Sequence, residues 1–195
     1  MRRSGSVVTA AVLALLALAG PAAADDKDDV MAAAKAWSTA LVDGDAKAIR
    51  AGSAGSETEI ARWEAMSKMF GSFQKLTDAV KAKYGDKANT AKLFQRPDFA
   101  SLGDDPKVAV TGVDATLTTQ EGKPPMKLKK EGAAWKVVLS SMPAAAAKLD
   151  PKQMTPLTEA VASTAEEIVA GKYPMQDDAM KALAAKMKAK AKPKE

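Results

Sequence analysis

The side chains that could carry chemistry in this chain are carboxylates, lysines, tyrosines and hydroxyls. Its 195 residues include neither histidine nor cysteine. Histidine is the commonest general base and zinc ligand, and cysteine supplies thiolate nucleophiles and disulfides. The composition therefore excludes Ser-His-Asp and Cys-His catalysis and disulfide bonds. We expect no catalytic residue, no metal site and no cofactor, although an enzyme built on a carboxylate, lysine, tyrosine or serine stays open.

Large aromatic side chains are the next candidates for a binding site. Pockets for small molecules are mostly apolar with a few polar groups. A domain of this size also needs several aromatic residues to fill its interior, and the chain has only nine. Both interpretations, with the core favoured over the ligand pocket, apply to Trp37, Trp63, Phe70, Phe73 and Trp135.

Methionines and the lysine-rich end each have a chemical alternative. The methionines could form an adaptable partner surface, and a copper(I) site is disfavoured because neither Cys nor His accompanies them. Residues 181–195 hold six lysines and one glutamate, which predicts a solvated tail, with binding to an anionic envelope surface as the alternative. Residues 25–180 carry a net charge of −2, so we expect no specific nucleic-acid binding.

Residues 1–24 are typical of a cleaved secretory signal peptide. Arg2 and Arg3 form the positive start, Val7 to Ala19 is an apolar stretch, and Ala22-Ala23-Ala24 supplies small residues for cleavage. The stretch is shorter than the ~20 residues of a membrane-spanning helix, although an uncleaved anchor is the alternative. We predict cleavage after Ala24 and export, to the periplasm or beyond the cell.

The elements that must position these residues begin with a helix predicted to start at Val30. Its apolar face consists of Val30, Ala34, Trp37 and Leu41. The acidic residues 25–29 are expected to fray, and Asp28 or Asp29 could cap the helix. Asp43-Gly44-Asp45 then ends it, with Gly44 in a left-handed position.

Two more helices are predicted before residue 86. Asp45 can cap a short one over residues 46–51, and a Gly/Ser/Ala loop follows. Ser56 and Glu59 have the spacing of a capping box for a long helix that ends at Gly85, and Gly71 within it indicates a kink or a close contact. The apolar face of the long helix consists of Ile60, Trp63, Ser67, Phe70, Phe73, Leu76, Val80 and Tyr84.

An antiparallel meander is predicted after Pro106, because the apolar period changes to two. Turns are expected at or near Gly112, at residues 121–124 and at residues 131–133. One face of each strand should be buried and the other exposed. The buried side chains are expected to be Val108, Val110, Val113, Ala115, Leu117, Met126, Leu128 and those of the strand from Trp135 to Leu139.

Helices return after Pro143. Thr155 is a plausible N-cap with Pro156 as the first helical residue, and Gly171 ends this helix. A last helix is predicted from Asp177 to about Lys190. The apolar stripes of the two helices are Leu157, Val161, Thr164 and Ile168, and Met180, Leu183, Ala184 and Met187.

This order of elements resembles the nuclear transport factor 2-like superfamily, in which a curved antiparallel sheet wraps around helices. The matching stretches are Ala33 to Ile49, with its Leu-Val-Asp-Gly-Asp segment, and Gly132 to Val138, with Trp135. The resemblance covers residues 28–142. It predicts an α+β fold over residues 25–142, in which N-terminal helices pack on a curved antiparallel β-meander, followed by a C-terminal helical extension over residues 143–195.

The resemblance also implies a conical pocket between the sheet and the long helix. Some members of the superfamily, such as ketosteroid isomerases and polyketide cyclases, are enzymes, but no catalytic residue can be carried over to this chain. Asp114 is the one carboxylate expected within a strand. It lies on the polar phase between Val113 and Ala115, so an exposed side chain is favoured over a pocket carboxylate with a raised pKa.

We therefore expect an exported, non-enzymatic domain that binds a small apolar ligand or an envelope partner. A carboxylate-dependent enzyme in the same conical pocket is one alternative. A structural envelope protein acting through its C-terminal helices is another, and a homodimer is left open.

Overall fold

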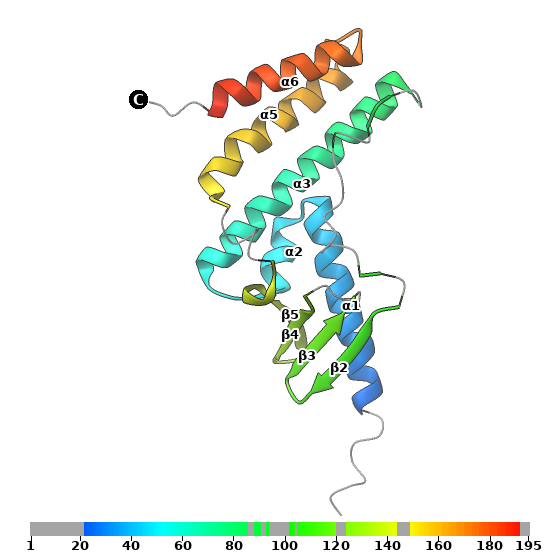
Figure 1. The fold of residues 1–195 in the computed structure, drawn as a ribbon, viewed down its shortest axis with the longest axis vertical. Coiled ribbons are helices and arrows are strands. Elements are labelled where there is room, and N and C mark those ends of the chain that lie inside the picture. The colour runs from blue at the N-terminus through cyan, green and yellow to red at the C-terminus, as the bar shows by residue number, and fades with distance from the viewer. Residues whose placement is uncertain are drawn as a thin grey trace, which may run out of the picture.

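The computed structural model describes residues 22–85, 88–90, 93, 102–103, 105–119, 124–143 and 149–191. The expected signal peptide up to residue 21, the turn at residues 121–123 and the lysines beyond residue 191 lie outside them. The predicted α+β class is confirmed (Figure 1). In chain order the elements are α1 (Ala22–Asp43), α2 (Ala46–Ala51), β1 (Ser53–Ala54), α3 (Glu57–Tyr84), β2 (Lys107–Thr111), β3 (Asp114–Thr118), β4 (Met126–Glu131), β5 (Ala134–Val138), the 3₁₀ helix η2 (Leu139–Ser141), α5 (Pro151–Val169) and α6 (Gln176–Ala191).

The sheet has the order β1-β5-β4-β3-β2. The predicted meander is confirmed, because β2 to β5 pair antiparallel in sequence order, with Leu117 opposite Met126 and Leu128 opposite Val137. The short β1, in what was predicted to be a loop, adds a parallel edge strand beside β5. Val113 was expected to be buried but is 54% exposed, because Gly112 and Val113 form the two-residue turn between β2 and β3; the φ of 61° at Gly112 favours glycine there.

One core lies between the sheet, α1, α2 and the N-terminal half of α3, and we call it the first core. The predicted α1 face is buried there. The indole N–H of Trp37 donates to the Ser53 hydroxyl at 2.9 Å, and its ring lies 5.1 Å from that of Trp63. The sheet contributes Ala115, Leu117, Met126, Leu128, Trp135 and Val137.

Helix α1 begins at Ala22, eight residues before the predicted start, and residues 25–29 are helical rather than frayed. Its first three residues, Ala22 to Ala24, precede the predicted cleavage point, so the cleaved chain would begin within this helix at Asp25. Asp26 pairs with Lys130 of the sheet at 2.5 Å, a contact between residues 104 apart in sequence. This long-range ion pair favours the added turns.

Helix α3 runs unbroken for 28 residues. The predicted capping box of Ser56 and Glu59 is confirmed. Of the two roles expected of Gly71, the structure shows the close contact: a Cβ atom at this position would lie 2.6 Å from the Gly44 Cα and 2.8 Å from the Asp43 carbonyl oxygen. The two glycines allow α3 to cross the end of α1 at backbone distance.

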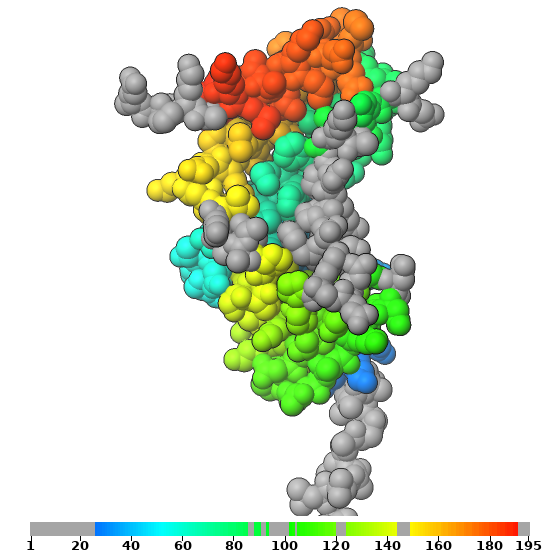
Figure 2. Space-filling model, viewed as in Figure 1, coloured from blue at the N-terminus to red at the C-terminus, as the bar shows by residue number. Residues whose placement is uncertain are grey.

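The C-terminal half of α3 packs on α5 and α6 and forms the second core. Figure 1 shows α5 running beside α3 in the same direction, with α6 returning along α5. In the space-filling view, α5 and α6 (yellow to red) form one end of the molecule and the strands (green) lie at the other (Figure 2). The buried members are Leu76, Ala79, Val80, Val161, Ala165, Ile168, Ala179 and Leu183.

The predicted start of α5 is wrong. The N-cap is Asp150, whose carboxylate accepts from the Lys152 N–H at 2.9 Å, and Pro151 is the first helical residue. Pro156 lies inside the helix, one turn later. Both Asp-Pro and Thr-Pro satisfy the local rule for a helix start, and the earlier one is used. No helix among the described residues is both long and apolar enough to span a membrane.

Candidate functional site

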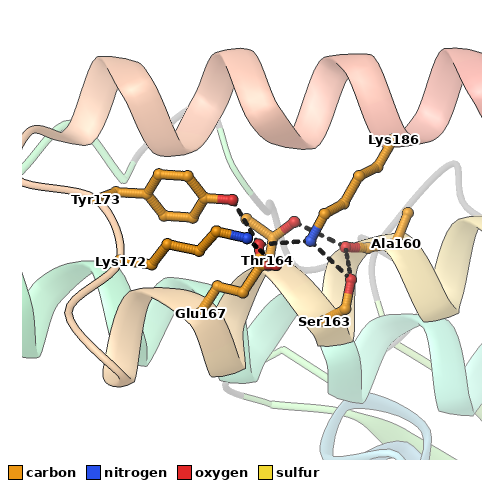
Figure 3. Close-up of polar contacts among 7 residues, drawn as sticks. All are labelled: Ala160, Ser163, Thr164, Glu167, Lys172, Tyr173 and Lys186. Carbon is orange, nitrogen blue, oxygen red and sulfur yellow. Dashed lines mark hydrogen bonds and ion pairs between the residues drawn. The ribbon is translucent and has the colours of Figure 1, made fainter.

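The densest polar cluster lies where α5 turns into α6 (Figure 3). The Glu167 carboxylate on α5 accepts hydrogen bonds from Lys172 Nζ at 2.7 Å, from Lys186 Nζ at 2.6 Å and from the Tyr173 hydroxyl. Lys172 and Tyr173 follow Gly171, whose φ of 76° lets the chain reverse there. Lys186 reaches the cluster from α6, so Glu167 joins three segments.

The hydrogen bonds explain the electrostatics of the cluster. Those from Lys172, Lys186 and Tyr173, in that order of effect, lower the pKa of Glu167 to about 2. The same carboxylate raises the pKa of the Lys172 ammonium and of the Tyr173 phenol. Glu167 is therefore a charged acceptor at neutral pH and not a base poised to take a proton.

Ser163 and Lys186 have the geometry of a nucleophile and its base. Lys186 Nζ lies 3.0 Å from the Ser163 hydroxyl oxygen, and serine-lysine pairs act in some hydrolases. However, the Lys186 ammonium also donates to Glu167, so it has no lone pair with which to accept the serine proton. The Ser163 hydroxyl itself bonds the Ala160 carbonyl at 3.2 Å. The arrangement therefore holds α6 against α5 rather than activating Ser163.

A second feature is a groove between α3 and α5, which we call the α3–α5 groove. Its larger hollow has a volume of about 680 Å³. The α3 wall consists of Ser72, Lys75, Asp78, Ala79 and Ala82. The α5 wall includes Ala162, Ala165, Glu166 and Val169. The small side chains leave space between the helices that larger ones would fill.

A smaller hollow of about 290 Å³ continues the groove toward the start of both helices. Ala61, Ala65 and Lys68 of α3 and Pro151, Thr155 and Glu159 of α5 line it. The helical spacing places both sets on the same stripe of each helix. The groove therefore follows the helix pair for most of its length.

An exposed valine makes the groove unusual. Val169 is 76% exposed, more than any other large apolar side chain among the described residues. A single exposed apolar residue is ordinary, but this one lies in the wall of a groove lined largely by alanine. The groove thus offers apolar surface with charged residues along its rims.

The structure separates the residues that the sequence singled out. Trp37, Trp63 and Trp135 are buried in the first core, and Phe70 packs against it, whereas Phe73 packs against the second core. Asp114 is exposed at the start of β3, as the favoured interpretation predicted. None of these six residues lines either hollow of the groove.

Sequence reasoning missed both the Glu167 cluster and the groove. A stripe of small residues at helical spacing along α3 and α5 was a visible signal, but it gains meaning only once the two helices lie side by side. Within the described part of the chain, no group of His, Cys, Asp or Glu residues could hold a metal ion.

Comparison with known proteins gives no relative. The chain matches no family model, no curated protein and no solved structure.

Proposed function

We propose that this chain is an exported, non-enzymatic binding protein whose α3–α5 groove receives an apolar partner. The observation that carries the proposal is the apolar lining of the groove, with Val169 76% exposed in its wall. Burying such a side chain in a complex contributes about 1.5 kcal/mol or more, so an exposed valine in a concave surface favours association.

The polar chemistry of the described residues supports a binding role over a catalytic one. The Glu167 carboxylate is held charged by three donors, and Lys186 is engaged by that carboxylate. Asp114 is exposed at the start of β3 and lines neither hollow of the groove.

Export rests on the signal-peptide pattern of residues 1–24, and the superfamily resemblance rests on sequence motifs. Both stay predictions. The resemblance also implies a pocket between the sheet and α3, but the three tryptophans expected to line it are packed in the first core.

The test is native mass spectrometry of the protein purified from the cells that produce it. We expect the wild type to retain an additional defined mass that is lost on unfolding. Val169→Asp places a charge in the groove and should abolish the retained mass. Val113→Asp is the matched control, because Val113 is also exposed (54%) but lies in a β-turn outside the groove. Bare chains in all three samples, or a mass that survives Val169→Asp, would overturn the proposal.

A further inference from the structure

We propose that the partner in the α3–α5 groove is a second copy of this chain, packed groove to groove about a two-fold axis parallel to the helices. The proposal rests on the proposed function and names its partner. Three observations support it: the spacing of the lining residues, the charges of the two rims and the length of the groove.

The spacing is that of helices that pack along their length. Among the lining positions, one series on α3 is 61, 65, 68, 72, 75, 79 and 82, and one on α5 is 151, 155, 158, 162, 165 and 169. Within each series, steps of four and three residues alternate, as in the contact seam of a coiled coil. The remaining lining residues, Glu64 and Asp78 on α3, Glu159 and Glu166 on α5, and Ala170 at the C-cap of α5, lie beside these series. Alanines at many positions of the two series allow close approach of another helix, and a second α3–α5 pair would complete a four-helix arrangement.

Two lysines of α3 and two glutamates of α5 share one register along the groove. The α3 side also carries two acidic residues: Glu64, which pairs with Arg50 within the chain, and Asp78, whose carboxylate accepts a hydrogen bond from Gln74. Lys68 and Lys75, seven residues apart, lie on the α3 side, and Glu159 and Glu166, also seven apart, lie on the α5 side. Lys68 lines the same hollow as Glu159, and Lys75 the same hollow as Glu166. The two lysines and the two glutamates are therefore matched in height along the groove.

This register selects one symmetry. A two-fold axis parallel to the helices places α3 of each copy opposite α5 of the other at the same height, so each lysine faces a glutamate. An axis across the helices would place α3 opposite α3 and reverse its direction, so lysines would face lysines. Complementary charges across an interface fix its register, and like charges exclude the alternative.

Lys75 and Glu166 are available for such pairing. Both side chains are exposed, and neither forms an ion pair with another described residue. Glu159 differs, because it pairs with Lys190 of α6 within the chain. The pair formed by Lys75 and Glu166 is therefore the one that tests the arrangement cleanly.

The size of the groove suits a dimer. A seam from residue 61 to residue 82 is about 32 Å long, and two adjacent helices are about 20 Å wide. Such a face would bury about 600 Å² on each copy, or about 1,200 Å² in total, which is the lower limit for a specific interface.

Sedimentation velocity over a range of protein concentrations tests the proposal. We expect a reversible wild-type dimer. Lys75→Glu and Glu166→Lys should each weaken self-association by about tenfold or more, because each creates two like-charge contacts per dimer. Lys81→Glu, an exposed change on another side of α3, should leave it unchanged.

Recombination of the charges gives the decisive result. An equimolar mixture of the two weakened variants should form a heterodimer, and the double variant Lys75→Glu/Glu166→Lys should self-associate again. Circular dichroism checks that every variant is folded. Two results would overturn the two-fold arrangement: single charge variants that dimerise as strongly as the wild type, or a double variant that does not regain self-association.

Failure of this inference is distinguishable from failure of the proposed function. A monomer at every concentration that still retains another mass, lost in Val169→Asp, would refute the second copy and leave the groove as a binding site. A dimer that survives Val169→Asp would refute both.

Discussion

The two cores at the two ends of α3 are built on different principles. The first contains all three tryptophans of the chain, a strand face and the glycine crossing of Gly44 and Gly71. The second is purely helical, contains several alanines and is closed by the ionic cluster around Glu167. Large side chains fill the first core, whereas small ones in the second leave a groove beside it. The N-terminal half of α3 therefore contributes the large buried side chains, whereas the C-terminal half lines the larger hollow of the groove.

The strongest challenge to this contrast is Trp37→Ala. Trp37 is 2% exposed and contacts Ser53 and Trp63, so its removal should lower the free energy of unfolding by about 4 kcal/mol. Urea denaturation followed by circular dichroism measures the loss. A smaller loss of unfolding free energy than that caused by Ile168→Ala in the second core would contradict the assignment of the first core as the dominant one.

Ile168→Ala truncates a fully buried side chain of the second core and should lower the free energy of unfolding by about 3 kcal/mol. Because every tryptophan lies in the first core, fluorescence reports on that core alone, whereas circular dichroism reports on all the helices. In Ile168→Ala, we expect the unfolding midpoint measured by circular dichroism to lie at a lower urea concentration than the midpoint measured by fluorescence. Coincident transitions would show that the two cores unfold as one unit.

Gly71→Ala sharpens the comparison within α3. Alanine in a helix ordinarily stabilises by about 1 kcal/mol relative to glycine. Here the added methyl group would lie 2.6 Å from the Gly44 backbone, so we expect a loss of about 2 kcal/mol instead. Ser72→Ala, one residue on, removes only a hydroxyl that donates to the Lys68 carbonyl of the same helix, and it should lower the free energy of unfolding by about 1 kcal/mol or less. A stabilising Gly71→Ala would mean that the helices separate readily at the crossing.

The smallest effect concerns the pH dependence of the second core. The pKa of Glu167 is about 2 in the folded chain, below its ordinary value of 4.5. Its stabilising effect is therefore fully present above pH 4.5 and is lost as the pH falls toward 2. At pH 7, Glu167→Gln should unfold at a lower temperature than the wild type, and this difference in Tm should disappear near pH 2. A difference independent of pH would assign the effect to packing.

Local signals were sufficient for most of the first core. The capping box of Ser56 and Glu59, the Gly44 turn and the period-two strands each depend on neighbours in sequence, and each was predicted from them. The two-residue β1 escaped prediction because it is too short to show alternation. The early start of α1 escaped because part of its support, the pair of Asp26 and Lys130, spans 104 residues.

The candidate site could not be predicted, for a related reason. The groove exists only where α3 meets α5, and residues that share a hollow, such as Lys75 and Glu166, are far apart in sequence. Lys172, Lys186 and Tyr173 each look like ordinary surface residues until Gly171 reverses the chain. The sequence did favour the correct exposure of Asp114, because alternation within one strand is a local property.

The continuity of α3 has a practical consequence for anyone dividing this protein. A fragment that stops at Pro143, the natural place to cut when judged by the sequence, would keep all of α3 but lose α5 and α6. Leu76 and Val80, now fully buried, would then face water. Such a fragment should self-associate and be poorly soluble, so assays of it would measure its aggregation. The two cores are therefore better studied with point variants of the full chain, because helix α3 contributes to both of them.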